Sequence, residues 1–177
     1  MHRLPMKELL RFFTLPAGLL VLMIALACTS NDPKNDPRFQ GMWKLDSIES
    51  YDSISGTWSH YQTDQYHDGY ILYDGKGHMA VHLTSKGYQD FDLSENVDSL
   101  DMEGLKERLK FYETNFVYFA DYKTTDNVID HNRLSATDPK NWGTVLTRDF
   151  EFKNDTLILS ARESIDANRL RLRWVKY

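Results

Sequence analysis

Arg148 has the most definite chemical possibilities in the sequence. Alternate residues of a strand share a face, and Arg148 is in register with Leu146, Phe150 and Phe152. If these apolar side chains face an interior, the guanidinium does too, and a buried cation requires a partner. Two interpretations are open. Arg148 binds the carboxylate or other anionic head of a ligand, or it pairs with a buried acid or stacks on an aromatic ring such as Trp43.

His131 and four aromatic residues are the other candidates for a binding site. His131 alternates with Ile129, so we expect it to face the same interior, either as a hydrogen-bonding partner of a ligand or as a structural histidine. The four aromatic residues have polar tips and would suit a flat or amphipathic ligand. They are Tyr70, Tyr118, Tyr122 and Trp142. The alternative is that these rings fill the core and leave no cavity.

The motifs that would indicate catalysis are missing from the sequence. We find no nucleophile motif, glycine-rich phosphate loop or paired-cysteine metal motif, so no catalytic residue and no cofactor is predicted. His78 and His82 are four residues apart, which is about 13 Å on a strand, too far for both to bind one metal ion. We therefore predict no metal site, and enzyme activity is the less favoured reading.

The N-terminal segment has the composition of an export signal. Arg3, Lys7 and Arg11 precede an uncharged apolar run that ends at Cys28, after which the chain turns polar. The segment Ile24-Ala25-Leu26-Ala27-Cys28 resembles the lipobox of bacterial lipoproteins. That resemblance implies a signal peptide over residues 1–27 and an acylated Cys28, with diacylglycerol and palmitate as the lipid. Two or three acyl chains would hold the protein stably on a bilayer.

The predicted mature chain is acidic and begins with a polar segment. Residues 1–27 carry a net charge of +2, so their removal takes the chain from −5 to −7. Since no long run of Lys or Arg is present, a nucleic-acid partner is not expected. Residues 28–40 hold Pro33 and Pro37 among polar residues and are expected to form a flexible tether. Residues 41–177 are of a length typical of one domain.

Short segments rich in β-branched and aromatic residues predict an all-β domain. Asp74-Gly75-Lys76-Gly77 is a hairpin signal, and residues 98–112 have apolar positions at helical spacing, which predicts one amphipathic helix that could cap a barrel. We expect an antiparallel barrel of about eight or nine strands, because closure removes the exposed sheet edges. The predicted strands are 42–51, 56–62, 69–74, 77–84, 115–125, 128–136, 143–153, 156–162 and 168–176.

Several segments together resemble the bacterial and fungal lipocalin-like domain family. They are Gly41-Met42-Trp43, Gly69 to Tyr73, Gly77 to Val81, Tyr118-x-Ala120-x-Tyr122, the strand with His131, Asn141 to Thr144, Arg148 to Phe152, Asp155 to Leu159 and Leu172-x-Trp174. The resemblance spans residues 41–176 and implies an up-and-down barrel whose floor is closed by Trp43. Asp149 and a polar insert at residues 86–98 depart from the family pattern.

Three functions follow as expectations. The first is a membrane-anchored protein that binds a small hydrophobic or amphipathic molecule in its barrel. The second is a structural or interaction lipoprotein of the cell envelope with a filled barrel and an unknown protein partner. The third, and least favoured, is an isomerase or cyclase. The expected location is the cell envelope, as an outer-membrane lipoprotein that faces the periplasm or the surface.

Overall fold

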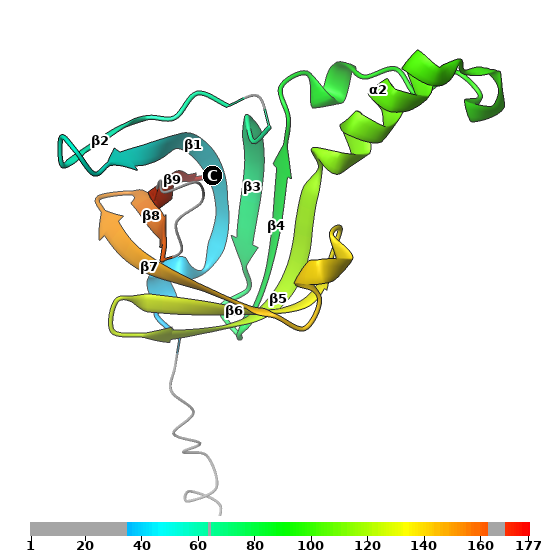
Figure 1. The fold of residues 1–177 in the computed structure, drawn as a ribbon. Helices are drawn as coiled ribbons and strands as arrows, with labels where there is room; N and C mark the ends of the chain where they lie inside the picture. The colour runs from blue at the N-terminus through cyan, green and yellow to red at the C-terminus, as the bar shows by residue number, and fades with distance from the viewer. Residues whose placement is uncertain (1–34, 64, 163–168) are drawn as a thin grey trace, which may run out of the picture. The chain divides into compact units, whose positions relative to one another are not determined.

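An antiparallel sheet of nine strands closes into a barrel through pairing of its first and last strands (Figure 1). The computed structural model describes residues 35–63, 65–162 and 169–177, and the part from Asn35 to Tyr177 forms one compact unit. The strands are β1 (Gly41–Asp52), β2 (Thr57–His60), β3 (Asp68–Tyr73), β4 (His78–Thr84), β5 (Phe116–Thr125), β6 (Val128–Ala136), β7 (Val145–Lys153), β8 (Thr156–Ala161) and β9 (Arg169–Lys176). The predicted fold class is confirmed.

Strand β1 takes part in three pairings, which sets the shape of the barrel wall. It pairs with β9 along most of its length, from Trp43 to Tyr51, and this pairing closes the barrel. On its other edge it pairs with β3 through Gly41–Lys44 alone. After a bulge between Leu45 and Ser47, the same edge pairs with β2. Eight strands therefore form the barrel, and β2 is an additional strand that extends from β1.

The hairpin turns form where the sequence predicts them. Between β3 and β4, one carboxylate oxygen of Asp74 accepts hydrogen bonds from the backbone N–H groups of Lys76, Gly77 and His78, at 2.7, 3.0 and 2.9 Å. Gly75 has a φ of 76°, which glycine adopts at no steric cost. The turn is therefore fixed by local chemistry.

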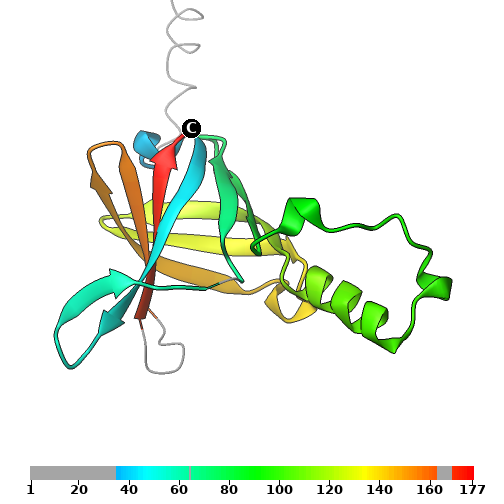
Figure 2. The ribbon, with the colours of Figure 1, turned by 90° about the horizontal axis from the view of Figure 1, so that it is seen from above.

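The helix α2 (Met102–Glu113) is present but does not pack as expected. The helix begins after Asp101, whose carboxylate accepts a hydrogen bond from the N–H of Gly104 at 2.9 Å. None of its residues is buried, and Leu105, Leu109 and Tyr112 are exposed. The expectation that this apolar row caps the barrel is wrong. Figure 2 shows the segment between β4 and β5 extending to the side of the barrel.

The chain closes one end of the barrel before the first strand begins. In the short 3-10 helix η1 (Pro37–Phe39), Phe39 is fully buried. Its ring packs edge-on against those of Tyr73, Phe150 and Phe152, with centroids 4.9 to 5.0 Å apart. Residues 28–40 were expected to be a flexible tether, but Phe39 belongs to the core because its ring fills the barrel floor. Residues 1–34, with the expected signal and Cys28, lie outside the described residues.

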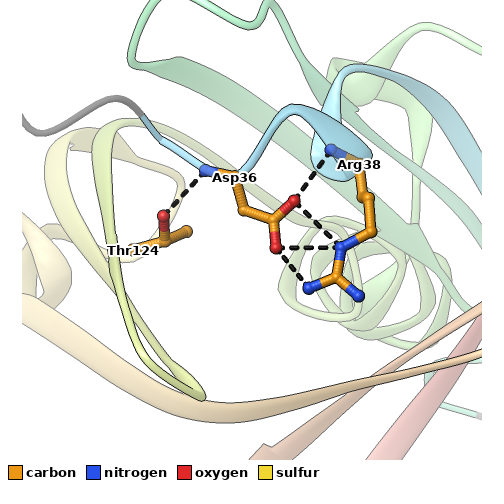
Figure 3. A network of polar contacts seen from close by, with 3 residues as sticks. All are labelled: Asp36, Arg38 and Thr124. Carbon is orange, nitrogen blue, oxygen red and sulfur yellow. Dashed lines mark hydrogen bonds and ion pairs between the residues drawn. The ribbon is translucent and has the colours of Figure 1, made fainter.

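Polar contacts hold this N-terminal turn in place (Figure 3). The N–H of Asp36 donates to Thr124 Oγ1 at 2.9 Å, and the N–H of Thr124 donates to Asn35 Oδ1 at 3.1 Å. The side chain of Asp36 binds the guanidinium of Arg38, and this hydrogen bond lowers the pKa of Asp36. The guanidinium carbon of Arg38 also lies 4.4 Å from the ring centroid of Phe152. The start of the described chain is thus attached to both β5 and β7.

Candidate functional site

A buried hydrogen-bonded group lies on the inner wall of the barrel, centred on His131. This residue is on β6 and is only 1% exposed. Its Nε2 lies 3.0 Å from the hydroxyl of Tyr73 on β3, and its Nδ1 lies 2.8 Å from the hydroxyl of Tyr118 on β5. A neutral imidazole has one donor and one acceptor nitrogen, so one tyrosine accepts a hydrogen bond while the other donates one. The prediction that His131 faces the interior is confirmed.

This group carries no charge at neutral pH. Burial, with added repulsion from Arg148 and Arg133, lowers the pKa of His131 to about 3. Burial also raises the pKa of Tyr73 and of Tyr118, so both phenols keep their protons. A general acid or base works best with a pKa near the working pH. His131 is therefore suited to hold hydrogen bonds, and it does not exchange a proton near pH 7.

Arg133 is the main residue that the sequence reasoning missed. It follows His131 by two positions on β6, and its exposure is 9%. Its Nε donates to Thr144 Oγ1 at 3.0 Å, its Nη2 binds the same oxygen, and its guanidinium carbon lies 5.9 Å from the ring centroid of Tyr118. In the described part of the chain Arg133 has no salt bridge. The sequence contains a signal for Arg133, because Ile129, His131 and Arg133 occupy alternate positions of one strand and therefore share a face.

Arg148 lies on β7 and is half-buried. Its Nη1 is 3.4 Å from the carbonyl oxygen of Thr147. It pairs in register with Ile129 on β6 and Ala161 on β8, which are both buried, so it occupies an inward position of the barrel wall, and its charge adds to the effect of burial in lowering the pKa of His131. Arg148 and Arg133 therefore generate a positive potential at His131. Whether Arg148 binds a ligand stays a prediction.

The four aromatic candidates are not brought together. Tyr118 belongs to the buried group, and Tyr122 packs at the floor, with its ring centroid 4.9 Å from that of Tyr73. Tyr70 lies on the outer face, because Ile71 and Tyr73 occupy the inward positions of β3, and its ring meets that of Tyr177. Trp142 is 57% exposed in the turn after β6, where its Nε1 donates to the carbonyl of Ala136. The expected places of Tyr70 and Trp142 in the lining are wrong.

Trp43 lies at the closed end, as the resemblance implied. It is buried, and its indole Nε1 donates to the carbonyl oxygen of Phe39 at 2.8 Å. Its ring lies 5.9 Å from that of Phe152. The indole thus ties the N-terminal turn to the first strand and helps to close the barrel floor.

Two surface openings lie outside this buried group. The first, the α2 cleft, has a volume of about 680 Å³ between the end of β4 and α2. The second, the β1 groove, has a volume of about 400 Å³ and is lined by Leu45, Ile48, His60, Tyr66 and His67, among others. Neither opening is lined by His131, Arg133 or Arg148.

The described residues contain neither a cluster of metal-binding side chains nor a helix suited to a bilayer. Within residues 35–63, 65–162 and 169–177, no three His, Cys, Asp or Glu side chains are grouped so that they could hold a metal ion. No helix among the described residues combines the length and apolarity that crossing a bilayer requires.

Several solved structures of low sequence identity are similar to this chain. No curated protein matches the sequence. Among solved structures, a lipocalin-like protein from Bacteroides uniformis is similar, with 13% identity, a TM-score of 0.40, and coverage of 79% of this chain and 99% of that one. An uncharacterized protein from Bacteroides eggerthii has 12% identity, a TM-score of 0.38, and coverage of 78% and 99%. A mutant of the fluorescent protein UnaG has 13% identity, a TM-score of 0.36, and coverage of 79% and 96%.

The sequence model of one domain family matches nearly the whole of the barrel. This family is described as the lipocalin-like domain, and the match covers residues 40–176. It therefore includes all nine strands, the helix α2 and the buried group around His131. The chain belongs to the lipocalin-like domain family.

Proposed function

We propose that the barrel binds a small amphipathic molecule whose anionic group lies against Arg133. The observation that carries this proposal is the state of the Arg133 side chain. It is buried, and in the described residues it binds the neutral hydroxyl of Thr144 and has no salt bridge. A guanidinium has five N–H donors, so a single hydroxyl leaves most of its hydrogen-bonding capacity unused. A bound carboxylate would supply both an opposite charge and further acceptors for these N–H groups.

The surroundings of Arg133 support an amphipathic rather than a fully polar ligand. The charge of Arg133 lowers the pKa of His131, as does that of Arg148, which indicates a positive potential along this wall. The inward positions of β4 and β5 are apolar or aromatic, among them Val81, Leu83 and Phe116. In an interior of low polarity a charge pair is stronger than in water. The wall therefore offers one cationic end and one apolar end.

Native mass spectrometry would test this proposal. The chain from residue 29 onward contains the whole compact unit and can be purified without the expected lipid. We expect a co-purifying small molecule that is released in denaturing solvent and is lost from an Arg133→Met variant. Arg162→Met is the matched control, because Arg162 is exposed and binds Asp149 on the outer face. A bound mass that Arg133→Met retains would contradict the proposal.

We also propose that Cys28 is acylated and anchors the protein to a membrane of the cell envelope, as an outer-membrane lipoprotein. The basic start, the apolar run and the position of the only cysteine support this. The test is cell fractionation of the full-length protein beside a Cys28→Ser variant, with mass spectrometry of the N-terminal peptide. Wild-type protein in the membrane fraction with an acylated peptide is the expected result. An unmodified Cys28 would overturn it.

A second candidate is an interaction protein with a filled barrel, and the surface of α2 favours it. Met102, Leu105, Leu109 and Tyr112 form an exposed apolar row along this helix. Such a row commonly marks a protein contact. If native spectra show the bare protein alone, and added amphipathic anions do not bind, this candidate replaces the first.

A further inference from the structure

The α2 cleft has the features of a second small-molecule site, separate from the barrel interior. It lies between the segment that follows β4 and the inner side of α2, and its volume of about 680 Å³ is within the range of ligand pockets. We propose that the α2 cleft binds a small planar aromatic anion, such as an aryl carboxylate. Its lining residues are distinct from those around Arg133, so this inference does not depend on the proposed function.

Stacked aromatic rings form the apolar surface of the cleft. The ring of Phe111 on α2 lies 4.6 Å from that of Tyr88, at an angle of 10°, and 4.2 Å from that of Phe91, at an angle of 16°. Two rings that are both nearly parallel to Phe111 at these distances cannot share one of its faces, so Phe111 lies between them. The ring of Tyr88 also meets that of His82, 5.7 Å away at an angle of 86°, so we assign a further ring to the face of Phe91 that points away from Phe111; Phe91 lines the cleft and is half-buried. Offset stacking is a favoured arrangement for aromatic groups.

Hydrogen bonds tie Tyr88 and the end of α2 to β4 and to the residue that follows it. The hydroxyl of Tyr88 accepts a hydrogen bond from Asn115 Nδ2 at 3.0 Å, and Asn115 Oδ1 lies 2.8 Å from Nε2 of His82 on β4. The hydroxyl of Thr114, at the end of α2, donates to Ser85 Oγ at 3.1 Å. The cleft is therefore preformed, which reduces the entropic cost of binding.

Charged residues on the lining favour an anion. Lys86 and Lys110 both line the cleft, and neither forms a salt bridge among the residues that the structure describes. Glu107 is the acidic residue of the lining, so the local net charge is +1. The side of the cleft is open at Gly87, where an added Cβ would meet no atom within 4 Å. A planar anion can therefore enter, stack, and reach the ammonium groups.

The probe for this proposal is 2-naphthoate, with the neutral 2-naphthamide as its comparison. Binding to the chain from residue 29 onward would be measured by calorimetry, and the site located from chemical-shift changes. A Lys86→Met and Lys110→Met double variant keeps the apolar stems and removes both charges. The matched control is a Lys76→Met and Lys123→Met double variant, because these exposed lysines lie near the closed end of the barrel.

We expect 2-naphthoate to bind more tightly than 2-naphthamide and to shift the ring resonances of Tyr88, Phe91 and Phe111. Each ammonium is exposed, so the cleft double variant should weaken 2-naphthoate about tenfold and leave 2-naphthamide unchanged. The control variant should bind as the wild type does. Absence of saturable binding would overturn the proposal. Unchanged affinity of the cleft double variant for 2-naphthoate would also overturn it. If only Arg133→Met lost 2-naphthoate binding, the probe would lie in the barrel interior and the proposal would be wrong.

Discussion

The closed end of the barrel and the wall around His131 are both buried, but their side chains differ in polarity. The closed end consists mainly of aromatic rings, whereas the wall holds hydrogen-bonded and charged side chains. At the closed end, Phe39 packs against Tyr73, Phe150 and Phe152 by edge-on ring contacts, and the guanidinium that meets the ring of Phe152, that of Arg38, is exposed and paired with Asp36. On the wall, two arginines lie near a neutral histidine that binds two phenols. Tyr73 belongs to both regions, because its ring packs at the floor and its hydroxyl reaches His131.

The difference indicates which region stabilises the fold and which is available for binding. Burial of aromatic rings favours folding, whereas a buried cation without a carboxylate lowers stability. A protein whose only requirement was stability would gain from apolar residues in place of Arg133. We infer that the floor maintains the barrel and that the wall retains a polar arrangement at some cost to stability.

The largest expected effect is at the floor. Phe39→Ala should lower the free energy of unfolding by about 3–5 kcal/mol, because it removes a fully buried ring and leaves a cavity. Phe119→Ala is the matched control, since Phe119 is 54% exposed on the outer face of β5 and should change stability by less than about 1 kcal/mol. Urea unfolding would measure both. Equal losses in the two variants would show that Phe39 is not part of the floor.

The second effect depends on pH and concerns His131. Its pKa is about 3 in the folded protein, against about 6.5 in the unfolded chain, so the unfolded state takes up a proton first as the pH falls. The stabilisation is complete above about pH 6.5 and is lost toward pH 3, at up to about 1.4 kcal/mol per pH unit. His131→Gln should flatten this dependence between about pH 7 and 5, and His82→Gln should not. Parallel plots of unfolding free energy against pH for the wild type, His131→Gln and His82→Gln would contradict the low pKa of His131.

The third prediction concerns Arg133, where the expected change in stability does not follow the loss expected at Phe39. Arg133→Met should leave stability unchanged or raise it by about 1 kcal/mol, because it replaces a buried cation with an apolar group of similar length. It should also raise the pKa of His131, since Arg133 lowers it. Unfolding curves and an NMR titration of His131 would measure these changes. A destabilisation of the size expected for Phe39→Ala would mean that Arg133 serves the fold.

The smallest effect is on the outer wall, where β1 meets β9. Glu49 binds Arg171 and lies 3.9 Å from Nη1 of Arg173, and these side chains are partly exposed. Glu49→Gln should lower the free energy of unfolding by about 0.5–1 kcal/mol, and by less at high salt. Glu151→Gln, which affects a more exposed pair with Lys153, is the control and should cost less. A loss that does not depend on salt would argue against an ionic contribution.

Much of the fold could be predicted because local patterns determine it. Alternation gave the inward direction of His131 and Arg148, and the turn residues gave the hairpins. The same rule shows why Tyr70 was wrongly placed, since Ile71 and Tyr73 are the residues in register on β3. Applied to β6, it would also have identified Arg133.

Other features depend on contacts that the sequence does not reveal. Phe39 follows a polar segment, and only the closed barrel shows that its ring fills the floor. The apolar spacing of α2 predicts a helix with a buried face, yet Phe111, outside that row, makes the stacking contacts. The pairing of His131 with Tyr73 and Tyr118 joins residues 58 and 13 positions apart, which a single sequence does not indicate.

The short ladder between β1 and β3 has a consequence for the motion of the barrel. It contains four residue pairs, Gly41 to Lys44 with Tyr70 to Tyr73, whereas β1 and β9 share eight. Local opening costs least where few interactions must break, so backbone amides along this ladder should exchange with solvent deuterium before those between β1 and β9. The barrel wall would then open at this seam without global unfolding.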